Sequence, residues 1–90
     1  MDEELLDIKP GDIFLSHFTR NLYLIVYVDA IRGIVKTRVY RLSNDTYIDI
    51  TYLYETDEDG LVSYPLDIFK RGWHFKLSDM DYDDLLCRMI

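Results

Sequence analysis

The chain has 90 residues and a formal net charge of −7, and hydrophobic residues make up 49% of it. This length allows one domain, and the apolar content with eight tyrosines excludes a disordered acidic chain. The acidic balance makes direct nucleic-acid binding unfavourable and excludes attraction to membrane surfaces, because both are anionic, and it favours basic partners.

The cellular compartment is indicated by the cysteine content and the N-terminal segment. Cys87 is the single cysteine, so an internal disulfide is excluded and a reducing compartment is favoured. No apolar run approaches the roughly 18–20 residues that a membrane-spanning helix needs. The opening MDEELLDIKPGD is acidic where a signal peptide would be basic. We therefore expect a cytoplasmic protein.

The first expected elements follow an acidic lead-in at residues 1–9. Pro10 and Gly11 turn the chain into DIFLSHF at 12–18, which is typical of a strand. LYLIVYVD at 22–29 is β-branched and aromatic, as expected for a central strand covered on both faces. Strict alternation places on one face Leu22, Leu24, Val26 and Val28, and on the other Tyr23, Ile25 and Tyr27.

A hairpin and further strands are expected next. AIRG, with Gly33 in a left-handed conformation, predicts the hairpin loop, and IVKTRVYRL at 34–42 alternates, so that one face should meet solvent. SNDT predicts a turn into a single strand at 47–55, YIDITYLYE. TDEDG turns the chain again into LVSY at 61–64, which Pro65 should end.

The last third predicts a short turn, a strand and a helix. PLDIF at 65–69 allows one helical turn, and GWHFKL at 72–77 is expected to be the final strand, with Trp73 and Phe75 closing a barrel. Ser78 opens a helix at 78–90 with aspartates in its first turn. Its apolar stripe is Tyr82, Leu85, Leu86 and Met89.

The expected fold class is therefore mainly β, within a single domain at residues 1–90. Short strands at regular spacing favour a small antiparallel barrel of five to six strands at 10–77, because closure removes exposed sheet edges. The C-terminal α-helix at 78–90 would cover one end of this barrel.

A family resemblance is carried by KPGDIFL, the following meander of strands, the turn PLDIF and the final strand GWHFKL. Over residues 9–77 this pattern resembles an SH3-like barrel. It is similar to the small SH3-like proteins that bacteriophages encode among their host-takeover and anti-defence genes. The resemblance implies a non-enzymatic binder of a host macromolecule, which would act in the host cytoplasm.

The opening PGDI is also similar to the first strand of MazF/PemK-type endoribonuclease toxins. The chain is short for that family, and no paired Arg and Ser/Thr site can be placed in it. We therefore carry over no catalytic residue.

Catalytic and metal chemistry is not indicated. His17 and His74 are the only histidines, and with Cys87 they form no compact set of zinc ligands. No nucleophile and base can be paired, and ETDEDG lacks the ligand spacing of a calcium loop. We therefore expect that the protein is not an enzyme and that it binds neither a metal ion nor a cofactor.

The main functional hypothesis rests on three acidic segments, at 1–12, 55–67 and 79–88. We expect an inhibitor or modulator that occupies a basic surface of a host or defence protein, with carboxylates imitating DNA phosphates. The candidate contacts are Asp57, Glu58, Asp59, Asp79, Asp81, Asp83 and Asp84, with Tyr52, Tyr54 and Tyr82 as anchors. The alternatives are that acidic surfaces only keep the protein soluble and that the helix aspartates only complement the helix dipole.

Two other hypotheses stay open. Basic and aromatic residues of the hairpin could bind a nucleotide or oligonucleotide, or act as a sponge for one, by stacking and phosphate contact. The residues of that candidate site are Arg32, Lys36, Arg38 and Tyr23. A small assembly protein that forms homo-oligomers through its Tyr-rich strands is the other alternative.

Overall fold

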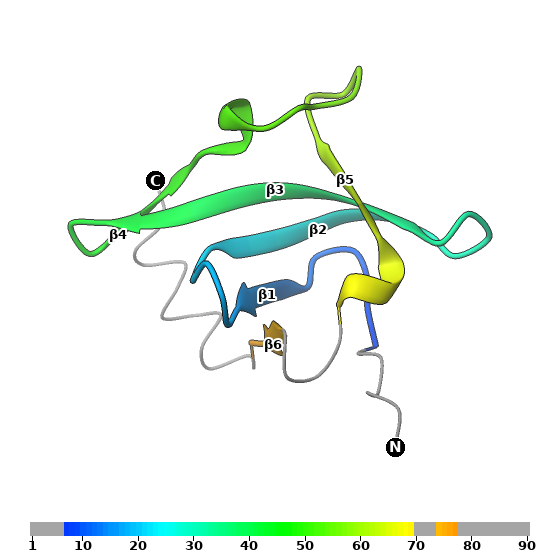
Figure 1. The fold of residues 1–90 in the computed structure, drawn as a ribbon, viewed down its shortest axis with the longest axis horizontal. Coiled ribbons are helices and arrows are strands. Elements are labelled where there is room, and N and C mark those ends of the chain that lie inside the picture. Colours follow the sequence, from blue (N-terminus) through cyan, green and yellow to red (C-terminus); the bar gives the residue numbers. More distant parts are fainter. Residues whose placement is uncertain (1–6, 70–73, 78–90) are drawn as a thin grey trace.

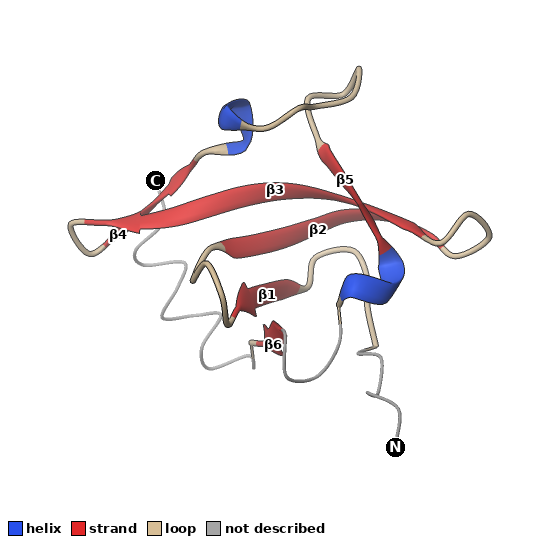
Figure 2. Ribbon diagram, in the orientation of Figure 1, coloured by secondary structure: helices blue, strands red, loops and turns tan. Residues whose placement is uncertain are grey.

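The computed structural model describes residues 7–69 and 74–77, and this part of the chain is mainly antiparallel β-sheet (Figures 1 and 2). The strands are β1 (Ile13–Ser16), β2 (Leu22–Asp29), β3 (Ile34–Ser43), β4 (Thr46–Asp49), β5 (Val62–Pro65) and β6 (His74–Lys76). The described residues also form two 3-10 helices, η1 (Thr51–Leu53) and η2 (Leu66–Ile68). The predicted helix at 78–90 and Trp73 lie outside the described residues.

The strands form one sheet in the order β4-β3-β2-β1-β6, and β5 also pairs with β3. The last strand returns to the first, so that β6 and β1 pair although they come from opposite ends of the described chain (Figure 1). One edge of β3 pairs with β2. The other edge is shared, because β5 pairs along Ile34–Thr37 and β4 pairs along Tyr40–Ser43. In the described part of the chain no helix is long and apolar enough to cross a membrane.

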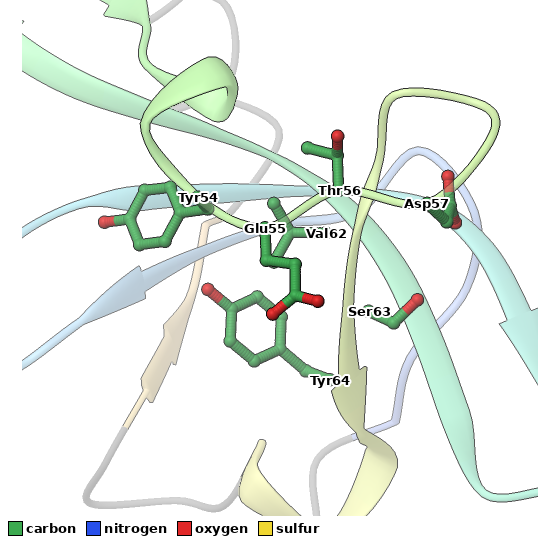
Figure 3. A pocket seen from close by; sticks show the side chains of 7 residues that line it. All are labelled: Tyr54, Glu55, Thr56, Asp57, Val62, Ser63 and Tyr64. Carbon is green, nitrogen blue, oxygen red and sulfur yellow. The ribbon is translucent and has the colours of Figure 1, made fainter.

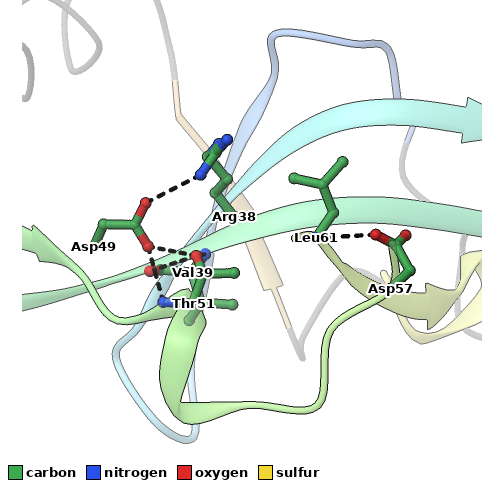
Figure 4. A network of polar contacts seen from close by, with 6 residues as sticks. All are labelled: Arg38, Val39, Asp49, Thr51, Asp57 and Leu61. Atoms are coloured by element: carbon green, nitrogen blue, oxygen red, sulfur yellow. Dashed lines mark hydrogen bonds and ion pairs between the residues drawn. The ribbon is translucent and has the colours of Figure 1, made fainter. Parts of the chain in front are cut away.

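The gap between β4 and β5 on β3 is closed by polar groups around Val39 (Figure 4). The hydroxyl of Thr51 accepts the Val39 N–H at 2.9 Å, and the N–H of Ile50 donates to the Val39 carbonyl at 2.8 Å. The carboxylate of Asp49 accepts the N–H of Thr51 at 2.8 Å and also bonds its hydroxyl. A buried backbone N–H that neither strand reaches is thereby satisfied.

This network shows that the single strand predicted at 47–55 is wrong. The strand ends at Asp49 and the chain turns into η1 at Thr51–Leu53. The physical reason is that the Asp49 and Thr51 side chains bond the local backbone, which competes with continued strand pairing.

The described residues form two apolar clusters, and these lie on opposite faces of the sheet because the strand neighbours Leu22 and Tyr23 belong to different clusters. The larger contains Phe14, Tyr23, Ile25, Val35, Val39, Ile50, Val62 and Phe69, and the smaller contains Ile13, Leu22 and Tyr40. The predicted alternation of β3 is confirmed as far as Val39, because Val35, Thr37 and Val39 are fully buried while Lys36 and Arg38 lie on the opposite face, half-buried and exposed respectively. It is wrong beyond Val39, because Tyr40 is buried in the smaller cluster and Arg41 is exposed. The outward face of Lys36 and Arg38 positions the cations that reach the site described below.

The predicted division of β2 into two faces is wrong beyond Ile25. The β2–β3 register shifts between Ile25 and Tyr27, as in a β-bulge. The extra residue leaves Val26 and Tyr27 40% and 51% exposed, and Val28 rather than Tyr27 packs with Ile25 against the larger cluster. The bulge therefore places two apolar side chains on the outside of the sheet.

Candidate functional site

The acidic loop, defined as residues 55–59, connects η1 to β5 and is held in place by Asp57. The Oδ1 atom of Asp57 accepts the N–H groups of Asp59 at 2.8 Å and Leu61 at 3.1 Å. The backbone N–H of Asp57 donates to the Leu61 carbonyl at 2.9 Å, and Gly60 takes a φ of 74° to close the turn. These bonds fix the loop before any partner binds.

A lysine on the sheet anchors the same carboxylate. The Nζ atom of Lys36 lies 3.0 Å from Oδ2 of Asp57 and 3.8 Å from Oδ2 of Asp59. The hydrogen bond to Lys36, with that to the Leu61 N–H, lowers the pKa of Asp57, and the same bond raises the pKa of Lys36. Asp57 therefore holds the loop together, and its side chain is only 24% exposed.

The other carboxylates of the acidic loop face solvent. Glu55 and Glu58 are exposed, and neither forms a hydrogen bond or ion pair with any residue that the structure describes. The side chain of Asp59 is 72% exposed, and its contact to Lys36 is long. Three carboxylates are therefore presented on a turn whose conformation a fourth carboxylate fixes.

A pocket of about 510 Å³ lies beside the acidic loop (Figure 3). It is lined by Tyr54, Glu55, Thr56, Asp57, Val62, Ser63 and Tyr64. The hydroxyl of Tyr54 accepts a hydrogen bond from the Asn21 amide at 3.1 Å, and the Tyr64 ring meets Tyr23 edge-on at 5.6 Å. Burial raises the pKa of Tyr64, so its phenol stays neutral. The walls are thus fixed and acidic, with aromatic surface.

The basic residues of the hairpin are matched to acids. Arg32 lies 3.7 Å from Asp29 and Arg38 lies 3.5 Å from Asp49, while Lys36 pairs with the acidic loop. Tyr23, the proposed stacking ring, is 8% exposed and belongs to the core. The structure does not bring these four nucleotide-binding candidates to one surface.

A second pocket, of about 600 Å³, lies on the outer face of the β2–β3 hairpin. Its lining residues are Val26, Tyr27, Asp29, Arg32, Lys36, Asp59 and Leu61. It brings Arg32 and Lys36 beside Tyr27, whose side chain the bulge places on the outside, although strict alternation put it on the face of Tyr23 and Ile25. Both cations already face carboxylates, so the pocket offers little positive charge to an anion.

The remaining candidates are spread over the chain. Tyr52 is 76% exposed on η1 and lines neither of these pockets. Outside the described residues lie Asp79, Asp81, Asp83, Asp84 and Tyr82. Among residues 7–69 and 74–77 there is no group of three or more side chains suited to hold a metal ion. Sequence reasoning missed Glu55, Ser63 and Tyr64, which only the folding of the loop against β5 brings together.

Comparison of the chain with protein-family models, with curated proteins and with solved structures found no match.

Proposed function

We propose that the protein is a non-enzymatic binding module whose acidic loop occupies a basic surface of a protein partner. One observation carries this proposal: Asp57 fixes the loop from within, and Glu55, Glu58 and Asp59 remain exposed. A loop that is ordered before binding loses little conformational entropy on association, so more of the contact energy appears as affinity.

The charge of the protein supports a cationic partner. The chain carries −7 overall, and the anchoring Lys36 neutralises only part of the loop. Complementary charge raises the association rate and selects against acidic partners, and its effect weakens with salt. The partner we propose is a host or defence protein whose basic surface normally binds nucleic acid, with the loop carboxylates in the place of phosphates.

We propose that the sheet closes as an SH3-like barrel of the kind encoded by bacteriophages, and that the protein acts in the host cytoplasm. The order of the elements supports this fold, because η2 follows β5 and the final strand β6 then pairs with β1.

A pull-down from bacterial lysate tests the proposed function. The tagged protein is used at low and high salt, with and without nuclease, and bound proteins are read by mass spectrometry. We expect one stoichiometric basic partner that is lost at high salt and is indifferent to nuclease. The triple variant E55Q/E58Q/D59N should lose this partner.

The matched control is D7N/D45N/D67N, which makes the same change in net charge at three exposed aspartates away from the loop. It should retain the partner. Equal loss in both variants would show that net charge alone drives the capture, and would contradict a role for the acidic loop. Retention in E55Q/E58Q/D59N would contradict it as well.

A further inference from the structure

The hydrogen bonds between β3 and β5 determine which way Ser63 directs its backbone. The N–H of Leu66 donates to the Gly33 carbonyl at 2.7 Å, and this pair continues the β3–β5 register. In an antiparallel ladder, hydrogen-bonded pairs alternate with pairs whose polar groups point away from each other. The next bonded pairs are Val35 with Tyr64 and Thr37 with Val62. Ser63 lies between them, so its N–H and C=O point to the outer edge of β5.

The outer edge of β5 is hydrogen-bonded at Leu61 but not at Ser63. The N–H and C=O of Leu61 are both bonded to Asp57. A continuing hairpin would pair Glu55 with Ser63 next, but no hydrogen bond between them is present. Within the described residues, the outward N–H and C=O of Ser63 have no partner.

Pro65 fits the same geometry. Proline has no N–H, and a strand tolerates it where that group would point away from the neighbouring strand. Pro65 lies opposite Ile34 at such a position, so its missing N–H costs no hydrogen bond to β3. The carbonyl of Pro65 begins the 3-10 helix η2, so the open edge offers one donor and one acceptor, the N–H and C=O of Ser63.

The pocket beside the acidic loop adjoins this open edge. Ser63 lines it with its neighbours Val62 and Tyr64, and the chain at Tyr54–Asp57 forms the opposite wall. Figure 3 shows Glu55 and the Tyr54 and Tyr64 rings on the side of β5 opposite to the Ser63 hydroxyl. Glu55 is exposed and makes no ion pair with a described residue, so it is available to a cation.

We propose that the outer edge of β5 takes an extended segment of the basic partner as an added β-strand. The N–H and C=O of Ser63 bond the main chain of this segment. Glu55 pairs with one of its Lys or Arg side chains, whose stem lies against the rings of Tyr54 and Tyr64. This inference rests on the proposed function and specifies how the partner is bound.

The test uses an acetylated and amidated peptide, Thr-Lys-Val-Lys-Thr, titrated into the ¹⁵N-labelled protein. The amide of Ser63 should exchange quickly with solvent in the free protein, and those of Val62 and Tyr64 slowly. At a peptide concentration about ten times its Kd, exchange at Ser63 should slow about tenfold, because only the free protein then exchanges. The peptide Thr-Glu-Val-Glu-Thr should leave Ser63 unchanged.

Two matched pairs of variants separate the contributions. S63P removes the outward N–H, whereas S63A keeps it and removes only the hydroxyl. We expect S63P to weaken the lysine peptide about tenfold, as for one lost hydrogen bond, and S63A to bind as the wild type does. E55Q should weaken it about two- to fivefold, as for an exposed ion pair, and D45N should not, because Asp45 is exposed in the turn between β3 and β4, outside both the acidic loop and the pocket.

The inference can fail without the proposed function. If the lysine peptide gives no protection of the Ser63 amide, or if a folded S63P binds it as tightly as S63A, strand addition is wrong. The exchange measurement needs no variant, so it decides the matter even if S63P does not fold. If the peptide test fails but E55Q/E58Q/D59N still loses the pull-down partner, the acidic loop remains the contact. Only the addition of a partner strand to β5 is then wrong.

Discussion

The Nζ atom of Lys36 lies 3.0 Å from Oδ2 of Asp57, and this ion pair joins the outer face of the sheet to the acidic loop. The two residues belong to different sequence-based hypotheses, Lys36 to a nucleotide site and Asp57 to a partner contact. In the folded protein these two side chains form an ion pair with each other. The pair therefore supports the loop, and the carboxylates beside it are left to make contacts.

Acid should weaken the anchoring of the loop through Asp57. Its pKa in the folded protein is below the ordinary 3.8, because of the hydrogen bonds from Lys36 and from the Leu61 N–H. The stabilisation is therefore complete above the unfolded pKa and is lost as the pH falls through the lower folded pKa. D57N should flatten this acid-dependent part of the stability. Urea unfolding from about pH 5 to about pH 2 measures it. An unchanged profile in D57N, with D67N as the control, would contradict the assignment.

His74 should make stability depend on pH in a separate, higher range. Burial beside Tyr23 and Phe69 lowers its pKa below the ordinary 6.5, and the charge of His17 adds to this, although the Ile68 carbonyl opposes it. The unfolded chain then takes up the proton first, so stability falls as the pH drops below 6.5 and stops falling below the folded pKa.

The variant H74F keeps an aromatic ring on β6 and should remove this dependence, which thermal unfolding between about pH 8 and about pH 5 would detect. H17Q changes the exposed histidine and should largely keep it. Equal slopes in the wild type and H74F would show that His74 is not the titrating group.

Thr51 should contribute more to the free energy of unfolding than an apolar side chain of the same shape. Replacing it with valine keeps the shape but leaves the buried N–H of Val39 without an acceptor. We expect a loss of about 1–3 kcal/mol in the free energy of unfolding. The control T46V changes a half-buried threonine on β4 and should stay within about 0.5 kcal/mol. Chemical denaturation of both variants compares them, and equal losses would refute a special role for Thr51.

Phe69 should be a main determinant of folding. It is completely buried and contacts the rings of Phe14 and His74, with centroids 5.3 and 4.7 Å away. F69A should cost about 3–5 kcal/mol, a large part of the stability of a domain this small. I31S, at a residue 98% exposed on the hairpin, should change it by less than about 0.5 kcal/mol. Circular dichroism during urea unfolding would show the difference, and a mild F69A would mean that the core relaxes around the cavity.

Local patterns predicted much of the sheet. The strand at Leu22–Asp29 and the start of the next at Ile34 were confirmed, because β-branched runs and a glycine with a φ of 68° at Gly33 act over short distances. The predicted helical turn near Pro65 is η2.

The features that failed depend on contacts between distant residues. The bulge at Val26 arises where one strand must match another, which a single sequence does not specify. The end of β4 at Asp49 combines local bonds between Asp49 and Thr51 with the bond from the distant Val39 N–H to Thr51. The site depends on such contacts too. Glu55 and Ser63 line one pocket because the bonds between Asp57 and Leu61 close the turn between them.

The return of β6 to β1 also has a consequence for folding kinetics. The β2–β3 hairpin is joined by a short loop, so its contacts close at low entropic cost, whereas β1 and β6 must find each other across nearly the whole described chain. We expect the hairpin to form in the folding transition state and β6 to dock afterwards. Substitutions in the hairpin would then slow folding, and substitutions in β6 would mainly accelerate unfolding.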